Sequence, residues 1–154
     1  MDHRELAAEL FLSDCNCAQA VLEAFGDVTG LEKSFAAKLA SSFGGGMGRM
    51  REVCGAVSGM LMVAGLLYGY DDPGENDVNK KAHYQLVQNL AGQFREEIGN
   101  IICREILDNP PSDPNPTPRT AEFYKTRPCV RMVMTAAGIL DDYIAEHPVT
   151  EHQL

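Results

Sequence analysis

Cysteine is the residue type in this sequence with the most chemistry to offer. The chain of 154 residues has five: Cys15, Cys17, Cys54, Cys103 and Cys129. In a reducing compartment thiols stay free, so cysteine enrichment there indicates metal binding or redox chemistry more often than structural disulfides. Composition leaves a second interpretation open, because free cysteine is also a common small residue of hydrophobic cores.

Four of these cysteines lie at or near the predicted start of a helix, and Cys15 is the exception. If the helix starts meet, the thiols of Cys17, Cys54, Cys103 and Cys129 converge at one end of a bundle. Four converging thiolates are the ligand set of an iron–sulfur cluster or a structural zinc ion, and pairs of them can instead cycle between dithiol and disulfide. The sequence has no C-x-x-C pair, so this prediction depends on how the helices are arranged and not on local spacing.

Cys54 is the leading candidate for a reactive thiol. It lies at the start of an uncharged run from Val53 to Tyr70, and it follows Arg49 and Arg51. In the first turn of a helix, the helix dipole and nearby arginines favour the thiolate form of a cysteine. The sequence therefore predicts a lowered pKa for Cys54.

A glycine cluster at positions 44, 45, 46 and 48 precedes this run, and a charged turn with Arg49, Arg51 and Glu52 separates the two. It fits a tight turn beneath the helix, a cradle of backbone N–H groups for an anion, or a set of N–H donors to cysteine sulfur. It lacks the Gly-Lys-Ser/Thr ending of a phosphate-binding P-loop, which makes nucleotide binding a poor fit.

Glycines also recur at four-residue intervals inside the run, as the pairs Gly55/Gly59 and Gly65/Gly69. Residues four apart share a helix face, and glycine lowers the stability of a helix interior. We therefore expect another element to pack very close to this helix. The second pair could also serve a homodimer interface.

The pattern of the whole chain predicts an all-α fold, a helical bundle of four longer helices plus short accessory helices. No segment alternates with a period of two, as a half-buried strand would. Ser13 or Asp14 is expected to cap the second helix and Ser34 the third. Residues 1–154 are predicted to form a single domain with a loose tail at 148–154. The predicted helices cover residues 3–12, 15–25, 35–43, 53–69, 76–98, 101–107, 121–125 and 129–146.

Charge and composition argue against several classes of function. A net charge of −9 disfavours binding to nucleic acids or to anionic membranes. The run at 53–70 is just long enough to span a membrane, but its glycines, cysteine and serine argue against a span. The start, MDHRELAAEL, has no leader pattern, so we expect a cytoplasmic protein. The four histidines stand among polar residues, are expected at the solvated surface, and form no recognisable catalytic pair.

In combination, the cysteine motifs resemble a known family. The segments CAQAVL with Cys17, FGGGMGR, CGAVSG with Cys54, CREIL with Cys103, and finally Cys129 are similar to the "putative redox-active" family named for its C-GCAxxG-C-C pattern. The resemblance covers about residues 14–146. It implies a small bacterial protein in which these four cysteines are the functional set and Cys15 is additional, and it names neither substrate nor partner.

Our leading hypothesis is an iron–sulfur electron carrier. In it, Cys17, Cys54, Cys103 and Cys129 bind the cluster, with [2Fe-2S] favoured, and a redox partner protein exchanges electrons with it. One alternative is a metal-free thiol–disulfide protein, in which Cys54 attacks and one of the other three cysteines resolves. The other is a helical interaction module with a structural zinc ion.

Overall fold

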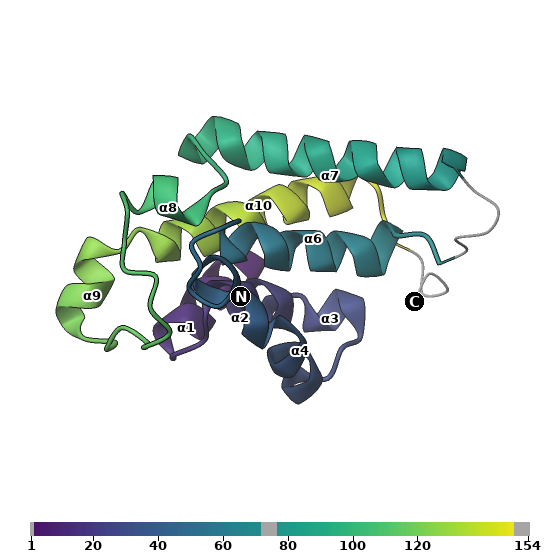
Figure 1. The fold of residues 1–154 in the computed structure, drawn as a ribbon. Helices are drawn as coiled ribbons and strands as arrows, with labels where there is room; N and C mark the ends of the chain where they lie inside the picture. The colour runs from purple at the N-terminus through teal and green to yellow at the C-terminus, as the bar shows by residue number, and fades with distance from the viewer. Residues whose placement is uncertain (1, 72–76, 150–154) are drawn as a thin grey trace.

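Helices make up the architecture of the computed structural model, which describes residues 2–71 and 77–149 (Figure 1). Within these two ranges the only β-type pairing is a single bridge between Val53 and Ile102, so the predicted all-α class is confirmed. The elements are α1 His3–Leu12, α2 Cys17–Ala24, α3 Gly26–Thr29, α4 Lys33–Ala40, the 3-10 helix η1 Ser41–Phe43, α5 Gly44–Met47, α6 Gly55–Tyr68, α7 Asp77–Ile98, α8 Cys103–Ile106, α9 Ala121–Thr126 and α10 Cys129–Glu146.

The three longest helices, α6, α7 and α10, pack against one another, and α1, α2 and α4 lie on the opposite side of α6 and α10 from α7 (Figure 1). Helix α2 packs on α6, and α1 packs on both α2 and α10. The uncharged run is a core helix, as expected from its composition: α6 buries residues such as Val57, Met60 and Val63. No helix of the described ranges combines the length and the apolar character needed to cross a membrane.

Close packing between α6 and α2 depends on two of the predicted glycines. A Cβ on Gly55 would lie 3.1 Å from the Cβ of Cys17, and one on Gly59 would lie 2.8 Å from the Ala18 carbonyl oxygen. The expected tight neighbour is therefore α2. The same expectation is wrong for the second pair, because a Cβ on Gly65 meets nothing within 4 Å and Gly69 lies beyond the end of α6.

Several helix ends differ from those predicted. Helices α1 and α10 begin and end where the pattern placed them. Helix α2, however, starts at Cys17, because Asn16 caps it through a reciprocal pair of hydrogen bonds with Gln19. That pair replaces the cap expected at Ser13 or Asp14 and leaves Cys15 outside the helix. Glu32 caps α4 in place of Ser34, and the segment at 41–43 continues as η1.

Some predictions fall on residues outside the described ranges. These are the break expected at Asp72, Pro73 and Gly74, the helix start at Asn76, and residues 150–154 of the predicted tail, which include His152.

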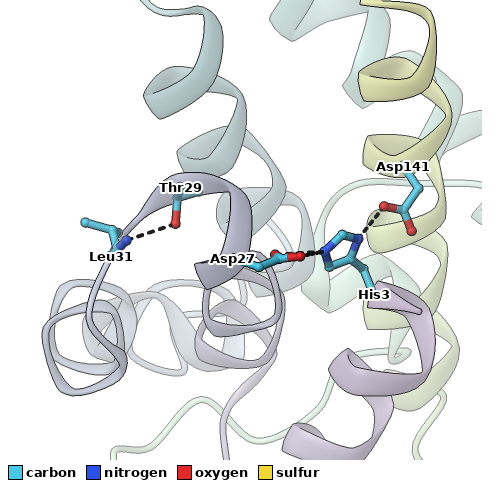
Figure 2. A network of polar contacts seen from close by, with 5 residues as sticks. All are labelled: His3, Asp27, Thr29, Leu31 and Asp141. Carbon is cyan, nitrogen blue, oxygen red and sulfur yellow. Dashed lines mark hydrogen bonds and ion pairs between the residues drawn. The ribbon is translucent and has the colours of Figure 1, made fainter. Parts of the chain in front are cut away.

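His3 is an exception to the expectation that histidines lie at the solvated surface. Its ring stacks on Phe25 with centroids 4.1 Å apart and is held between two carboxylates (Figure 2). Nδ1 lies 2.5 Å from Asp141 and Nε2 lies 2.9 Å from Asp27. Burial lowers the pKa of His3, but the hydrogen bonds to Asp27 and Asp141 outweigh it, so the net pKa is raised. His3 thereby links α1 to α3 and α10.

Candidate functional site

The glycine cluster forms a left-handed turn beneath the start of α6. Every residue from Gly45 to Arg49 has a positive φ, between 61° and 71°, and Arg51 follows with a φ of 61°. This conformation costs a residue with a Cβ roughly 1–2 kcal/mol. Two backbone hydrogen bonds help to hold the turn, from Arg51 N to Gly45 O at 3.2 Å and from Glu52 N to Gly46 O at 2.9 Å. The tight turn expected from the glycines is therefore present.

Backbone pairing beyond the turn joins the cysteine at the start of α6 to the cysteine at the start of α8. Cys54 N donates to Ile101 O at 2.8 Å, and Cys103 N donates to Glu52 O at 2.6 Å. Arg104 reinforces the same pairing, because its Nη2 donates to Glu52 Oε1 at 2.5 Å. Cys54 is the N-cap of α6, one position before the helical turn in which it was expected, and Cys103 is the first residue of α8.

The other two cysteines reach the same place from α2 and α10, of which Cys17 and Cys129 are the first residues. The side chains of all four cysteines, Cys17, Cys54, Cys103 and Cys129, line one small cavity of about 30 Å³. Cys54 and Cys103 are buried, with 5 % and 6 % of their surface exposed. Cys15 does not line this cavity, and its thiol donates to the Glu23 carboxylate at 3.3 Å.

Two of the four thiols also line a second, wider pocket. Cys17 and Cys129 contribute to a pocket of about 310 Å³ whose wall includes the glycine turn, α9 and the proline-rich loop at residues 108–120. This pocket is distinct from the small cavity, since Cys54 and Cys103 do not line it. The thiol set therefore has a closed side and a side that a small molecule can approach.

Arginine side chains surround the wider pocket. Four line it: Arg49, Arg51, Arg119 and Arg127. Arg49 and Arg51 also fix the proline-rich loop, since their Nε atoms donate to Asp113 O at 2.8 Å and to Pro111 O at 2.9 Å. Arg119 donates to Phe11 O and Cys15 O, both at 3.1 Å, and its guanidinium lies 4.5 Å above the Phe11 ring. The loop is thus part of the site wall.

Cys17 and Cys129 line both cavities, and their pKa values move in opposite directions. The Cys17 side chain hydrogen-bonds to the Cys129 sulfur, which lowers the pKa of Cys129 and raises that of Cys17 well above its ordinary value. Burial opposes the lowering at Cys129, and the positive charges of Arg127, Arg119 and Arg51 reinforce it. Cys129 is therefore the thiol of this pair that ionises more readily.

The pKa of Cys54 is raised to about 12, and the prediction of a lowered value is wrong. Burial is the main cause, and the backbone N–H groups of Ala56 and Val57 only partly offset it. At Cys103, burial also raises the pKa, against a hydrogen bond in which Arg51 Nη1 donates to the sulfur at 3.7 Å. A helix start favours a thiolate only where the charge is not also taken out of water.

The cysteine set was also predicted to bind a metal cofactor. Across residues 2–71 and 77–149, no three His, Cys, Asp or Glu side chains are grouped so that they could hold a metal ion. The assignment of Cys17, Cys54, Cys103 and Cys129 as ligands of an iron–sulfur cluster or of zinc stays a prediction.

Three site residues escaped the sequence analysis, namely Arg119, Arg127 and Phe123. Phe123 lines the wider pocket, and both arginines lie over its ring, at 4.9 and 5.4 Å from the centroid. A usable signal was present, since the segment PRTAEFYKTRPCVR before and around Cys129 carries four positive charges and only one negative charge. In a chain of net charge −9, such a segment next to a cysteine predicts a local positive site.

Comparison with known proteins gives one match. A family model described as "Putative redox-active protein (C_GCAxxG_C_C)" matches residues 15–143, a range that contains all five cysteines. No curated protein and no solved structure matches the chain.

Proposed function

This chain belongs to that redox-active family, and we propose that its redox centre is the thiol pair Cys17 and Cys129. In the reduced state Cys129 carries the thiolate and Cys17 the proton. Oxidation joins the two sulfurs in a disulfide and releases two electrons and the one proton that Cys17 carries. The family resemblance supports redox chemistry, and the geometry of the pair supports this form of it.

The observation that carries this proposal is that Cys17 and Cys129 line both the small cavity and the wider, approachable pocket, with pKa shifts of opposite sign that each owes to the other. The thiolate is the attacking species in thiol–disulfide exchange, and a neighbouring thiol that can resolve the mixed disulfide completes the cycle. Cys129 meets the first requirement through its lowered pKa, and Cys17 meets the second through its contact with Cys129. We therefore assign the role of attacking thiolate to Cys129, in place of Cys54, the residue expected from the sequence.

Mapping of the disulfide after mild oxidation tests the proposal. Wild-type protein is expected to lose two thiols and to yield a Cys17–Cys129 cross-link in peptide mass spectrometry. Cys17→Ser and Cys129→Ser each abolish the cross-link, and Cys15→Ser is the matched control that retains it, because Cys15 is bonded to Glu23 outside both cavities. A dominant cross-link between any other pair, or no cross-link, would contradict the proposal.

A second candidate function is electron transfer through an iron–sulfur cluster. Its support is that four cysteines, the donor type such clusters take, line one cavity, but no three of them within residues 2–71 and 77–149 are grouped so that they could hold a metal ion. Cys17, Cys54, Cys103 and Cys129 would hold the cluster, which would supply one-electron transfer to a partner protein.

Metal and labile-sulfide content of protein purified without oxygen separates the candidates. Iron and sulfide at stoichiometric levels, with a visible absorption band, would establish the cluster. Zinc alone would favour the structural module, and a protein without either metal that forms the Cys17–Cys129 cross-link reversibly is the outcome expected for the dithiol centre.

A further inference from the structure

The wider pocket beside Cys17 and Cys129 has a strong imbalance of charge. None of its lining residues in the described part of the chain is acidic, whereas four are arginines. Two carboxylates outside the lining contact its arginines: Asp113 lies 4.0 Å from Arg49, and Asp14 lies 3.9 Å from Arg119. Both acids are at least half exposed, so water weakens their hold on the arginines. The pocket is thus a positive site on a protein of net charge −9.

Arg51 provides an independent sign that an acceptor belongs in this place. Its side chain lines both the pocket and the small cavity, and only 4 % of the residue's surface is exposed. Nε donates to Pro111 O and Nη1 to the Cys103 sulfur, but Nη2 is buried without a partner among the described residues. A buried guanidinium N–H without an acceptor is costly, and an anion seated between the arginines would satisfy it.

Hydrophobic side chains complete the pocket. Phe11 and Phe123 line it beside the arginines, and Pro114 and Pro116 come from the loop. The wall therefore pairs a site for negative charge with apolar surface, and Cys129 lies within the same pocket.

We propose that this pocket binds small anionic disulfides and their thiols, and that it selects them as the substrates of Cys129. The proposal rests on the proposed dithiol function and names its substrate class. An anionic group of the substrate, a carboxylate or a phosphate, lies among Arg51, Arg119 and Arg127, with its disulfide sulfur against the sulfur of Cys129.

Two exchange steps transfer the disulfide bond from the substrate to the protein. The Cys129 thiolate attacks one sulfur of the substrate R–S–S–R, forms a Cys129–S–S–R bond and releases R–S⁻, which takes up the proton of Cys17. The Cys17 thiolate then attacks the Cys129 sulfur, forms the Cys17–Cys129 disulfide and releases the second R–S⁻, which is protonated by water. The substrate disulfide is reduced to two thiols, and the protein dithiol is oxidised.

A series of three disulfides of similar size and different charge tests the selectivity. We would measure the rate of Cys17 and Cys129 oxidation by 3,3′-dithiodipropionate, bis(2-hydroxyethyl) disulfide and cystamine, each divided by its rate with free N-acetylcysteine. The anionic reagent is expected to exceed the cationic one by on the order of tenfold or more, and added salt should reduce the ratio. Equal normalised rates for the three reagents would overturn the proposal while leaving the dithiol centre intact.

Arg127→Gln is the decisive variant, because this side chain lines the pocket and lies over the Phe123 ring, and within the described residues it donates no hydrogen bond whose loss would disturb the fold. It should reduce the charge selectivity severalfold. Arg131→Gln is the matched control, since Arg131 is an exposed arginine of α10 whose Nη2 bonds to Glu97 O, away from the pocket. A loss of selectivity in both variants alike would indicate general electrostatics and would contradict a dedicated pocket.

An alkylation assay separates failure of this proposal from failure of the dithiol function, because it requires no disulfide. The ratio of labelling by iodoacetate to labelling by iodoacetamide is measured at Cys129 and, as an internal reference, at Cys15 beside Glu23. A ratio severalfold higher at Cys129, reduced by Arg127→Gln, supports the anion pocket even if no Cys17–Cys129 cross-link forms. Equal ratios at the two cysteines contradict it, whatever the cross-link shows.

Discussion

At the scale of single residues, the thiols differ because of what surrounds each sulfur. Cys54 and Cys129 both lie at helix starts, yet burial raises the pKa of the first to about 12 while the pKa of the second is lowered. At Cys129, the Cys17 thiol and the arginine charges lower the pKa. At Cys54, burial is the largest influence, and it raises the pKa. Helix position alone does not activate a cysteine.

The pH dependence of alkylation tests this difference. Only the thiolate reacts, so a lowered pKa shifts the rate profile toward lower pH. Labelling of Cys129 by iodoacetamide is expected to rise at a lower pH than labelling of Cys15, whose pKa is raised to about 11 by burial and by Glu23. Cys17→Ala, which removes the hydrogen bond, should move the Cys129 profile upward. Coinciding profiles at Cys129 and Cys15, measured by peptide mass spectrometry, would contradict the assignment.

Gly46 is a residue at which any side chain should disturb the site. A Cβ there would lie 2.7 Å from the Cβ of Cys103 and 2.7 Å from Glu52 N, at a φ of +71°. We expect Gly46→Ala to lower the free energy of unfolding by about 2–3 kcal/mol and to increase alkylation of Cys103. Gly48→Ala is the control, because it carries a similar φ of +61° but would meet only Ser42 O at 3.9 Å. If urea unfolding shows the same decrease in the free energy of unfolding for both variants, the positive φ, and not contact with Cys103, decides the effect.

At the scale of elements, α6 is positioned by contact with α2 along one glycine face. Gly55 and Gly59 allow the backbones to approach, and this approach brings Cys17 beside the start of α6. On the other side, pairing of residues 51–54 with 101–104 attaches α8. The site is therefore formed by the ends of elements whose bodies make the core.

Two alanine substitutions within α6 should have opposite effects on stability. Gly59→Ala introduces a Cβ 2.8 Å from Ala18 O and 3.0 Å from Val21 Cβ, and should lower the free energy of unfolding by about 1–3 kcal/mol. Gly65→Ala enters open space in the same helix and should raise it by roughly 0.5–1 kcal/mol, because alanine favours the helix. Denaturant unfolding of both variants measures this, and a destabilised Gly65→Ala would indicate a partner on that face.

At the scale of the whole molecule, His3 joins three elements from distant parts of the chain (Figure 2). Because its pKa in the folded protein is raised above the ordinary value of 6.5, its protonated form stabilises the fold. This contribution is full below pH 6.5 and disappears as the pH rises through the folded-state pKa, which lies above 6.5.

His3→Gln should therefore destabilise the protein by roughly 1 kcal/mol at pH 6 and by less at pH 9. Thermal unfolding across this pH range is the measurement. His147→Gln is the control, since His147 stacks on Tyr143 and has no carboxylate partner in the described structure. A constant difference between wild type and His3→Gln at all pH values would show that the ring contributes by packing on Phe25 alone.

The sequence predicted the fold better than the site, for physical reasons. The bounds of α1 and α10 followed from apolar periodicity, and the core position of α6 followed from its lack of charge. The Val53–Ile102 bridge has no periodic signal, because it pairs single residues on segments far apart in the chain. Burial of Cys54 is likewise a property of its neighbours and not of its own motif.

The pairing of residues 51–54 with 101–104 also has a consequence for how the protein is made. Because synthesis proceeds from the N-terminus, Cys17 and Cys54 are made first. Cys103 follows only after the whole of α6 and α7, and Cys129 is the last of the four. Until α10 emerges, Cys17 has no thiol partner in the proposed redox pair and the small cavity lacks one wall. We expect redox competence to appear only in the completed chain, and a nascent chain halted before Cys129 to carry thiols that react as ordinary, unassembled cysteines.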